Sequence, residues 1–149
     1  MTHLSPTTTV PIKSICTATL TVETRGQGFF DITEDVRRFV AQAGASDGAL
    51  FLFLRHTSAS LTIQENADPD VQKDLMTALG RLAPLDAGWV HDTEGLDDMP
   101  AHVKAMLTGV GLHVPVAGGA LSLGTWQGIY LIEHRFRPQR REVLLQCII

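Results

Sequence analysis

Three histidines in the sequence stand at positions where folding could bring them to one pocket. His56 follows an apolar strand-like run, His91 follows a second short apolar stretch, and His102 lies in the first turn of an expected helix. Functional groups favour such element ends, because a rigid scaffold aims loop side chains at one point. Three imidazoles with an open position could bind zinc or a similar divalent ion, and protonated histidines at helix N-termini could instead bind a phosphate. The spacing leaves both chemistries open.

Acidic side chains flank these histidines and could orient them through the second ring nitrogen. We expect Glu65, Asp70 and Glu94 to hold the imidazoles or to bind the metal. Asp70 stands four residues before Asp74 on one helical face, where like charges repel unless a cation or a histidine lies between them. The acidic residues that could serve in this way are Glu65, Asp70, Asp92, Glu94, Asp97 and Asp98.

A serine or cysteine nucleophile is not indicated. Ser58 lies two residues from His56, but the sequence contains no G-x-S-x-G elbow. Cys147 has apolar neighbours, which would raise the pKa of its thiol. Cys16 and Cys147 alone make neither a disulfide framework nor a zinc knuckle, so we expect two buried, reduced thiols.

Polar residues near the C-terminus could complete the pocket. Gln127 and Glu133 lie on the same side of an expected strand over residues 124–136 and could line a polar cleft. Four arginines between positions 135 and 141 form the basic cluster of the chain. They could receive a phosphate or the carboxylates of another subunit, although a solvated hairpin turn is the default interpretation.

Hydrophobic periodicity predicts the elements that must position these groups. The unbroken apolar run 49–54 predicts a central strand covered on both faces. Thr33 is expected to cap the first helix, and Asp68 followed by Pro69 is a strong start for the second. The stretches 56–70 and 89–102 are expected to be loop-rich bridges. Strands are predicted over 16–23, 49–54, 112–116, 124–136 and 142–149. Helices are predicted from the Thr33 cap to Gly44, from Asp68-Pro69 to just before Pro84, and from Asp98 to the glycines at 109 and 111.

The chain is predicted to form a single α+β domain. Its 149 residues, 44% apolar and 19% charged, are typical of a globular domain. Strands outnumber helices and do not alternate with them, which favours a β-sandwich-like fold of mostly antiparallel sheets with about three helices. Residues 1–9, rich in Ser, Thr and Pro, are expected to be a flexible tail, and residues 10–149 the domain.

Composition also bears on partners and location. The formal charge of −4 argues against a nucleic-acid partner, which normally meets a basic face. No apolar run approaches the ~20 residues of a membrane helix, and the N-terminus lacks the basic and apolar regions of a secretory signal. We therefore expect a cytoplasmic protein with no membrane or nucleic-acid partner.

Three motifs together resemble the YjbQ family, and the match spans nearly the whole chain. They are HTSASLTIQENAD at 56–68, His91 followed by Glu94-Gly95 and DMPAH at 98–102, and LGTWQGI at 123–129. The resemblance implies a β-sandwich-like domain that assembles as a homotrimer. It also implies a polar pocket formed by His56, His91 and His102, which could hold zinc or magnesium.

The resemblance further implies a secondary thiamine-phosphate synthase activity, which joins a pyrimidine pyrophosphate to a thiazole phosphate. In that reaction the cations of the pocket would neutralise charge on the departing pyrophosphate. His102 is the expected phosphate contact, and the expected substrate contacts are Ser58, Thr125, Gln127 and Glu133. Two alternatives stay open: a trimeric, non-catalytic binding protein for a small phosphorylated metabolite, and a metal-dependent hydrolase.

Overall fold

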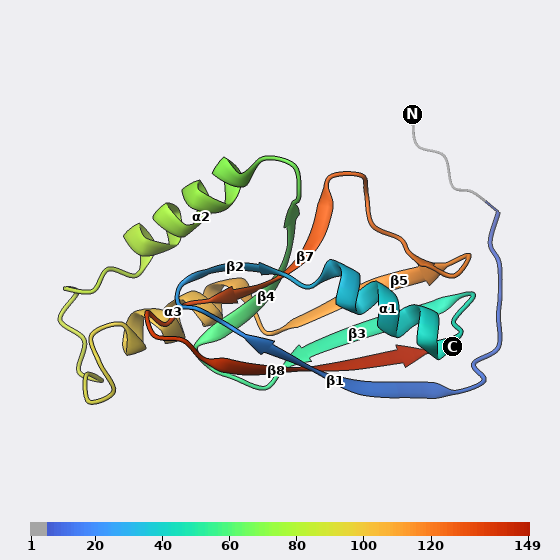
Figure 1. Cartoon of the computed structure of the whole chain (residues 1–149), viewed down its shortest axis with the longest axis horizontal. Coiled ribbons are helices and arrows are strands. Elements are labelled where there is room, and N and C mark those ends of the chain that lie inside the picture. The colour runs from blue at the N-terminus through green and yellow to red at the C-terminus, as the bar shows by residue number, and fades with distance from the viewer. Residues whose placement is uncertain (1–5) are drawn as a thin grey trace.

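Two antiparallel sheets form the body of the protein, in a computed structural model that describes residues 6–149 (Figure 1). All neighbouring strands in these sheets are antiparallel. The five-stranded sheet has the order β1 (Ile15–Glu23), β8 (Arg140–Ile148), β3 (Gly48–Leu54), β5 (Gly111–Ala117) and β6 (Ala120–Leu121). The three-stranded sheet has the order β2 (Gly28–Asp31), β7 (Gln127–Glu133) and β4 (Ala59–Glu65). The described residues also form three helices: α1 (Thr33–Ala43), α2 (Pro69–Leu82) and α3 (Asp98–Thr108).

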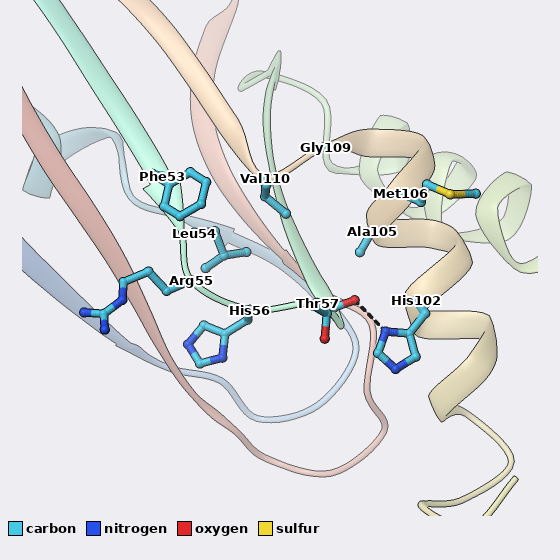
Figure 2. Close-up of a pocket in the computed structure, with 10 residues that line it drawn as sticks. All are labelled: Phe53, Leu54, Arg55, His56, Thr57, His102, Ala105, Met106, Gly109 and Val110. Atoms are coloured by element: carbon cyan, nitrogen blue, oxygen red, sulfur yellow. Dashed lines mark hydrogen bonds between the residues drawn. The ribbon is translucent and has the colours of Figure 1, made fainter. Parts of the chain in front are cut away.

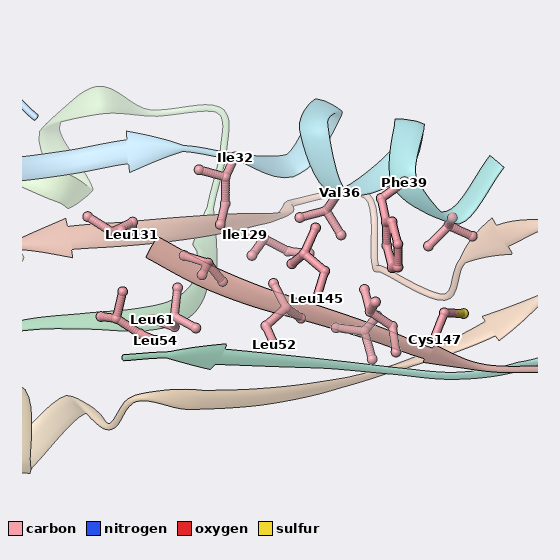
Figure 3. Close-up of a cluster of buried hydrophobic side chains, with 14 of the residues drawn as sticks. Ile32, Val36, Phe39, Leu52, Leu54, Leu61, Ile129, Leu131, Leu145 and Cys147 are labelled. Carbon is pink, nitrogen blue, oxygen red and sulfur yellow. The ribbon is translucent and has the colours of Figure 1, made fainter. Parts of the chain in front are cut away.

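The core lies on the inner face of the five-stranded sheet. Figure 3 shows this face covered at one end by the three-stranded sheet and at the other by α1. Leu52 and Leu145 point into the core from β3 and β8, and meet Leu131 of β7 and Val36 of α1. This arrangement confirms the expected α+β class with mostly antiparallel sheets in a single domain.

The helix ends follow local chemistry. The side chain of Asp68 accepts a hydrogen bond from the Asp70 amide at 2.9 Å, and Pro69 occupies the first helical position of α2, as predicted. The predicted cap of α1 is wrong, because Thr33 is the first residue of the helix rather than its cap. The Thr33 hydroxyl instead accepts a hydrogen bond from the Ile129 amide of β7 at 2.8 Å, which ties α1 to the three-stranded sheet.

The segment after His56, expected to be a loop, contains strand β4. It pairs along its whole length with β7, from Ala59 opposite Glu133 to Glu65 opposite Gln127. The sequence of β4 does not show the usual alternation of apolar and polar residues. The polar residue Ser60 is fully buried, and the second half of the strand is only partly buried. The short strand β2 was also missed by sequence reasoning.

The central position of β3 is confirmed, but its expected cover on both faces is wrong for a single chain. The residues Leu50, Leu52 and Leu54 are at most 2% exposed, whereas Phe53 on the other face is 51% exposed. The alternation places one face of β3 in the core and leaves the other at the surface.

Of the expected tail over residues 1–9, residues 1–5 lie outside the described residues, and residues 6–9 form neither helix nor strand. Among the residues that the structure describes, no helix combines the length and apolar character needed to cross a bilayer.

Candidate functional site

Two of the three expected histidines meet around one carboxylate. The ligand atoms of His91, Asp98 and His102 all lie within 4.8 Å of one another, and we call these residues the His–Asp–His cluster. Asp98 and His102 are one turn apart on α3, and His91 comes from the segment that precedes this helix. The Oδ2 atom of Asp98 is 2.8 Å from Nε2 of His91 and 3.5 Å from Nε2 of His102.

A backbone hydrogen bond orients the His102 ring. Its Nδ1 atom lies 3.0 Å from the carbonyl oxygen of Thr57, as Figure 2 shows. Because a carbonyl oxygen only accepts, the proton of the neutral ring is assigned to Nδ1. The lone pair on Nε2 is then directed at the cluster, which is the arrangement that metal-binding histidines usually have.

The Asp98 carboxylate is held from its other side by Arg135. Asp98 is 2% exposed, and its Oδ1 atom accepts a hydrogen bond from Nη1 of Arg135. The same guanidinium donates from Nε to Oδ2 of Asp97 at 3.1 Å. Burial alone would raise the pKa of Asp97, but hydrogen bonds from the Phe136 amide and Arg135 outweigh it and lower that pKa. Arg135 therefore leaves only the Oδ2 atom of Asp98 to face the imidazoles.

Two imidazole nitrogens and one carboxylate oxygen are a donor set suited to zinc. Magnesium prefers an all-oxygen environment, so it suits this cluster less well. The chemistry and spacing of the three donor atoms thus fit a zinc-like ion.

His56 lies outside the cluster, although it was expected to be part of it. Its Nε2 atom accepts a hydrogen bond from the Glu142 amide at 3.0 Å, and its Nδ1 atom is 3.5 Å from Nη1 of Arg141. Burial lowers the pKa of His56, and the nearby charge of Arg141 lowers it further. Because Nε2 accepts a hydrogen bond, its lone pair is already used, and the proton of the neutral ring is assigned to Nδ1. This favours a structural imidazole over a metal ligand.

An apolar pocket of about 710 Å³ adjoins the cluster through His102. Figure 2 shows His56 and His102 on either side of Thr57 at this pocket. Its apolar walls come from the end of β3 and from the C-terminal half of α3. These wall residues are Phe53, Leu54, Ala105, Met106, Gly109 and Val110.

Glu133 and Arg141, two of the polar residues that were expected to complete the pocket, form a buried ion pair. Glu133 is fully buried, Arg141 is 5% exposed, and two hydrogen bonds of 2.6 and 2.7 Å join them. The Ser58 hydroxyl accepts from Nη2 of Arg141 at 3.0 Å. The expectation that Glu133 lines an open cleft is therefore wrong, because its carboxylate is enclosed by Arg141 and also accepts from the Arg135 amide at 2.9 Å.

The structure separates Glu65 and Gln127 from the cluster. They pair at the far end of the β4–β7 ladder, about 20 Å along the strands from Glu133. The exposed residue Thr125 lies at the same end, and its carbonyl oxygen accepts a weak hydrogen bond from Asn66.

Asp70 and Glu94 are also outside the cluster. Asp70 is at the start of α2, where its exposed carboxylate pairs with Lys73 at 2.6 Å. Glu94 is exposed and contributes its backbone carbonyl, which accepts from Nη2 of Arg135 at 2.8 Å. The carboxylate that the fold places between the imidazoles is Asp98 instead.

The sequence did not indicate that Asp98 and Arg135 are central to the site. Asp98 was considered as a neighbour of the histidines and as a helix start, yet its four-residue spacing from His102 on one helix face was the signal for a shared site. The pairing of Arg135 with Asp98 joins residues 37 positions apart, and no local pattern reveals it.

Another feature that the sequence did not indicate is a buried histidine. His134 is completely buried and its Nε2 atom is 2.8 Å from the Ser60 hydroxyl. Burial and the charge of Lys104 lower the pKa of His134 to about 4. Its Nδ1 atom has no hydrogen-bond partner in the part of the chain that the structure describes.

The fold and the cluster together define a small α+β domain with a candidate metal pocket between a helix start and a sheet edge. The chain belongs to the YjbQ-like UPF0047 family, because the model of that family, described as "UPF0047 protein YjbQ-like", matches residues 18–149. This match confirms the resemblance noted from the three motifs.

Curated relatives support the same assignment. UPF0047 protein sll1880 of Synechocystis is 47% identical over 127 residues, which cover 85% of this chain and 86% of the relative. UPF0047 protein YugU of Bacillus subtilis is 40% identical over 110 residues, covering 74% and 82%. These names give no activity.

A solved structure shares the fold. The uncharacterised YjbQ/UPF0047 protein of Clostridium acetobutylicum has a TM-score of 0.81 and 39% identity, over 89% of this chain and 99% of that one. These similarities therefore establish the family and the fold, and they indicate no activity.

Proposed function

We propose that this protein is a metal-dependent enzyme that acts on a small phosphorylated substrate. The observation that carries the proposal is the His–Asp–His cluster, whose three donor atoms lie within 4.8 Å beside an apolar pocket of about 710 Å³. A mostly apolar pocket with a few polar groups at one end is typical of a small-molecule site. The reaction to test first is the joining of a pyrimidine pyrophosphate to a thiazole phosphate.

Each residue of the His–Asp–His cluster would contribute to metal binding in a different way. His102 presents Nε2 because Thr57 holds its Nδ1 proton, and Asp98 presents Oδ2 because Arg135 occupies Oδ1. His91 is about half-exposed, so it can move with an incoming ligand. A divalent ion held by these three residues would supply positive charge to the phosphate oxygens and to the departing pyrophosphate.

The pocket residues would bind and orient the rest of the substrate. The walls of β3 and α3 exclude water from the apolar part of a ring system, which strengthens the polar contacts at the His102 end. Arg55 stands at the rim, 58% exposed, and its contact with Glu142 is a loose 3.8 Å. Its guanidinium is therefore available to a second phosphate group.

The proposal extends to assembly and location. We propose a homotrimer that works in the cytoplasm, with a second copy of the chain covering the outer face of β3 and the neighbouring end of α3. The support is apolar exposure: Phe53 is 51%, Met106 78% and Leu107 56% exposed in the single chain.

The decisive experiment measures metal content and turnover together. Purified protein is loaded with zinc or magnesium, and thiamine phosphate formed from the two phosphorylated precursors is measured by chromatography. We expect His91→Ala, Asp98→Asn and His102→Ala each to lose bound metal and at least 10-fold in rate. Asp74→Asn is the matched control, because Asp74 is exposed on α2 and lies outside the cluster.

The outcomes separate the proposal from its alternatives. Unchanged rates in all three cluster variants would overturn it. A tightly retained small molecule without product would indicate a binding protein, and chelator-sensitive release of phosphate from simple esters would indicate a hydrolase.

A further inference from the structure

The two cysteines, distant in sequence, are direct neighbours in the five-stranded sheet. Strands β1 and β8 pair in the register that places Cys16 opposite Cys147. Both residues lie on the inward-facing side of their strands, since the residues of β1 and β8 alternate in burial and these two fall on the more buried positions. Their side chains therefore leave the sheet from the same face, one beside the other.

The hydrogen-bond pattern defines the spacing of this pair. At one end of the ladder Ser14 and Ile149 exchange both backbone hydrogen bonds, at 2.8 and 3.0 Å, and at the other the Thr24 amide donates to Gln139 at 2.8 Å. Bonded pairs recur every second residue in an antiparallel ladder, so Cys16 and Cys147 form a bonded pair.

Such a pair is within reach of a covalent bond, although the bond would be strained. The Cα atoms of a hydrogen-bonded antiparallel pair are ~5.5 Å apart, within the range of disulfides, but the Cβ atoms are also about 5.5 Å apart, beyond the usual ~3.5–4.5 Å, so a disulfide here would be readily reduced. We propose that Cys16 and Cys147 are a modification site, at which a disulfide oxidant such as oxidised glutathione links β1 to β8. This inference is independent of the function proposed for the His–Asp–His cluster.

The exposure of the two thiols assigns their order of reaction. Cys16 is half-buried and reachable from solvent, whereas Cys147 is fully buried. Burial raises the pKa of the Cys147 thiol, and the adjacent Cys16 raises it further, so Cys147 is the poorer first nucleophile.

The Cys16 thiolate attacks one sulfur of oxidised glutathione, forms a mixed disulfide and releases one glutathione thiolate. Cys147 then loses its proton and attacks the sulfur of Cys16, which releases the second glutathione. Two protein thiols are oxidised and one oxidised glutathione is reduced to two molecules of glutathione.

The bond would join the two ends of the chain. In Figure 1 the paired ends of β1 and β8 lie at the opposite end of the sheet from α3, so the link leaves the cluster untouched. Strand β1 is an edge strand that contacts the sheet only through β8. Linking it to β8 closes a loop of nearly the whole chain and restricts the unfolded state.

The test uses the folded, full-length protein and oxidised glutathione as the probe. After incubation, free thiols are blocked and the protein is cut with trypsin without reduction. We expect peptide 14–25 linked to peptide 142–149, with a mass two hydrogens below their sum and loss of the link on reduction. Because the link is strained, a low concentration of dithiothreitol should cleave it in the folded protein and restore two free thiols.

Two single variants are the matched controls. Cys147→Ala should stop at a stable glutathione adduct on Cys16, and Cys16→Ser should leave Cys147 unreacted in the folded protein. The proposal is overturned if the wild-type protein keeps two free thiols, stops at the glutathione adduct on Cys16, or forms disulfide-linked dimers.

Discussion

At the scale of single residues, Asp98 shows how one buried carboxylate can serve two partners. Its Oδ1 atom faces the guanidinium of Arg135 and its Oδ2 atom faces the two imidazoles of the cluster. A buried carboxylate needs such partners, because desolvation would otherwise favour its neutral form. Asp98 and His102 are held by Arg135 and by the Thr57 carbonyl before any ligand arrives, and this reduces the entropy that binding must remove.

His134 gives the protein a specific dependence on pH. Its pKa is about 4 in the folded protein because of burial and the charge of Lys104, against 6.5 in an unfolded chain. The unfolded state therefore takes up a proton first as the pH falls. Stability is fully present above pH 6.5 and is lost between pH 6.5 and pH 4, by up to about 3 kcal/mol from this residue.

This prediction is checked by urea unfolding at pH 7 and pH 4.5 for the wild type and His134→Gln. The Gln amide can keep a hydrogen bond to Ser60 but does not titrate. We expect the wild type to lose clearly more stability than the variant over this pH range. Equal losses in the two proteins would show that His134 is not the titrating group.

At the scale of elements, the pair Glu133–Arg141 links the two sheets, since Glu133 is the last residue of β7 and Arg141 is the second residue of β8. Removing one partner of a buried pair leaves the other charge without compensation, which costs about 3–5 kcal/mol. We expect Glu133→Gln to lower the free energy of unfolding by about that amount in a denaturant titration.

An exposed pair is the matched control for that variant. Glu23 and Arg140 are 3.7 Å apart with side chains 71% and 67% exposed, so solvent screens their attraction. Glu23→Gln should change the free energy of unfolding by less than about 0.5 kcal/mol. Comparable losses for Glu23→Gln and Glu133→Gln would contradict the role given to the buried pair.

At the scale of the whole molecule, the outer face of β3 is the strongest indication of assembly. Phe and Leu alternate along β3, and because the Leu face is in the core, Phe53 is left half-exposed. The exposed Met106 of α3 lines the same pocket as Phe53. Burial against another chain would remove this apolar area from water. We expect light scattering to give three times the 16.2 kDa mass of one chain.

Substitution tests the assignment of that face. Phe53→Glu should shift the protein to a single-chain mass, because burying an unpaired carboxylate in an interface is unfavourable. Leu82→Glu is the control, as Leu82 is 65% exposed at the end of α2, away from this face. A monomeric wild type, or a Phe53→Glu variant that stays assembled, would contradict the proposed interface.

The helices and most strands could be predicted from the sequence because their signals are local. The Asp68 cap followed by Pro69 is a contact within a few residues, and the alternation after Cys16 is a pattern visible within one nine-residue stretch. Strand β4 was missed for the same reason. Its buried Ser60 looks polar in sequence and is satisfied only by the distant His134.

The sequence by itself determined the family, the α+β class and the presence of His91 and His102 near a helix start. Only the tertiary structure decided that Asp98 lies between these imidazoles, that His56 faces Glu142 and Arg141 instead, and that Cys16 opposes Cys147. The physical reason is how far apart in the sequence the interacting residues lie. Helix and strand patterns arise from neighbours along the chain, whereas ion pairs and strand register depend on how distant segments pack.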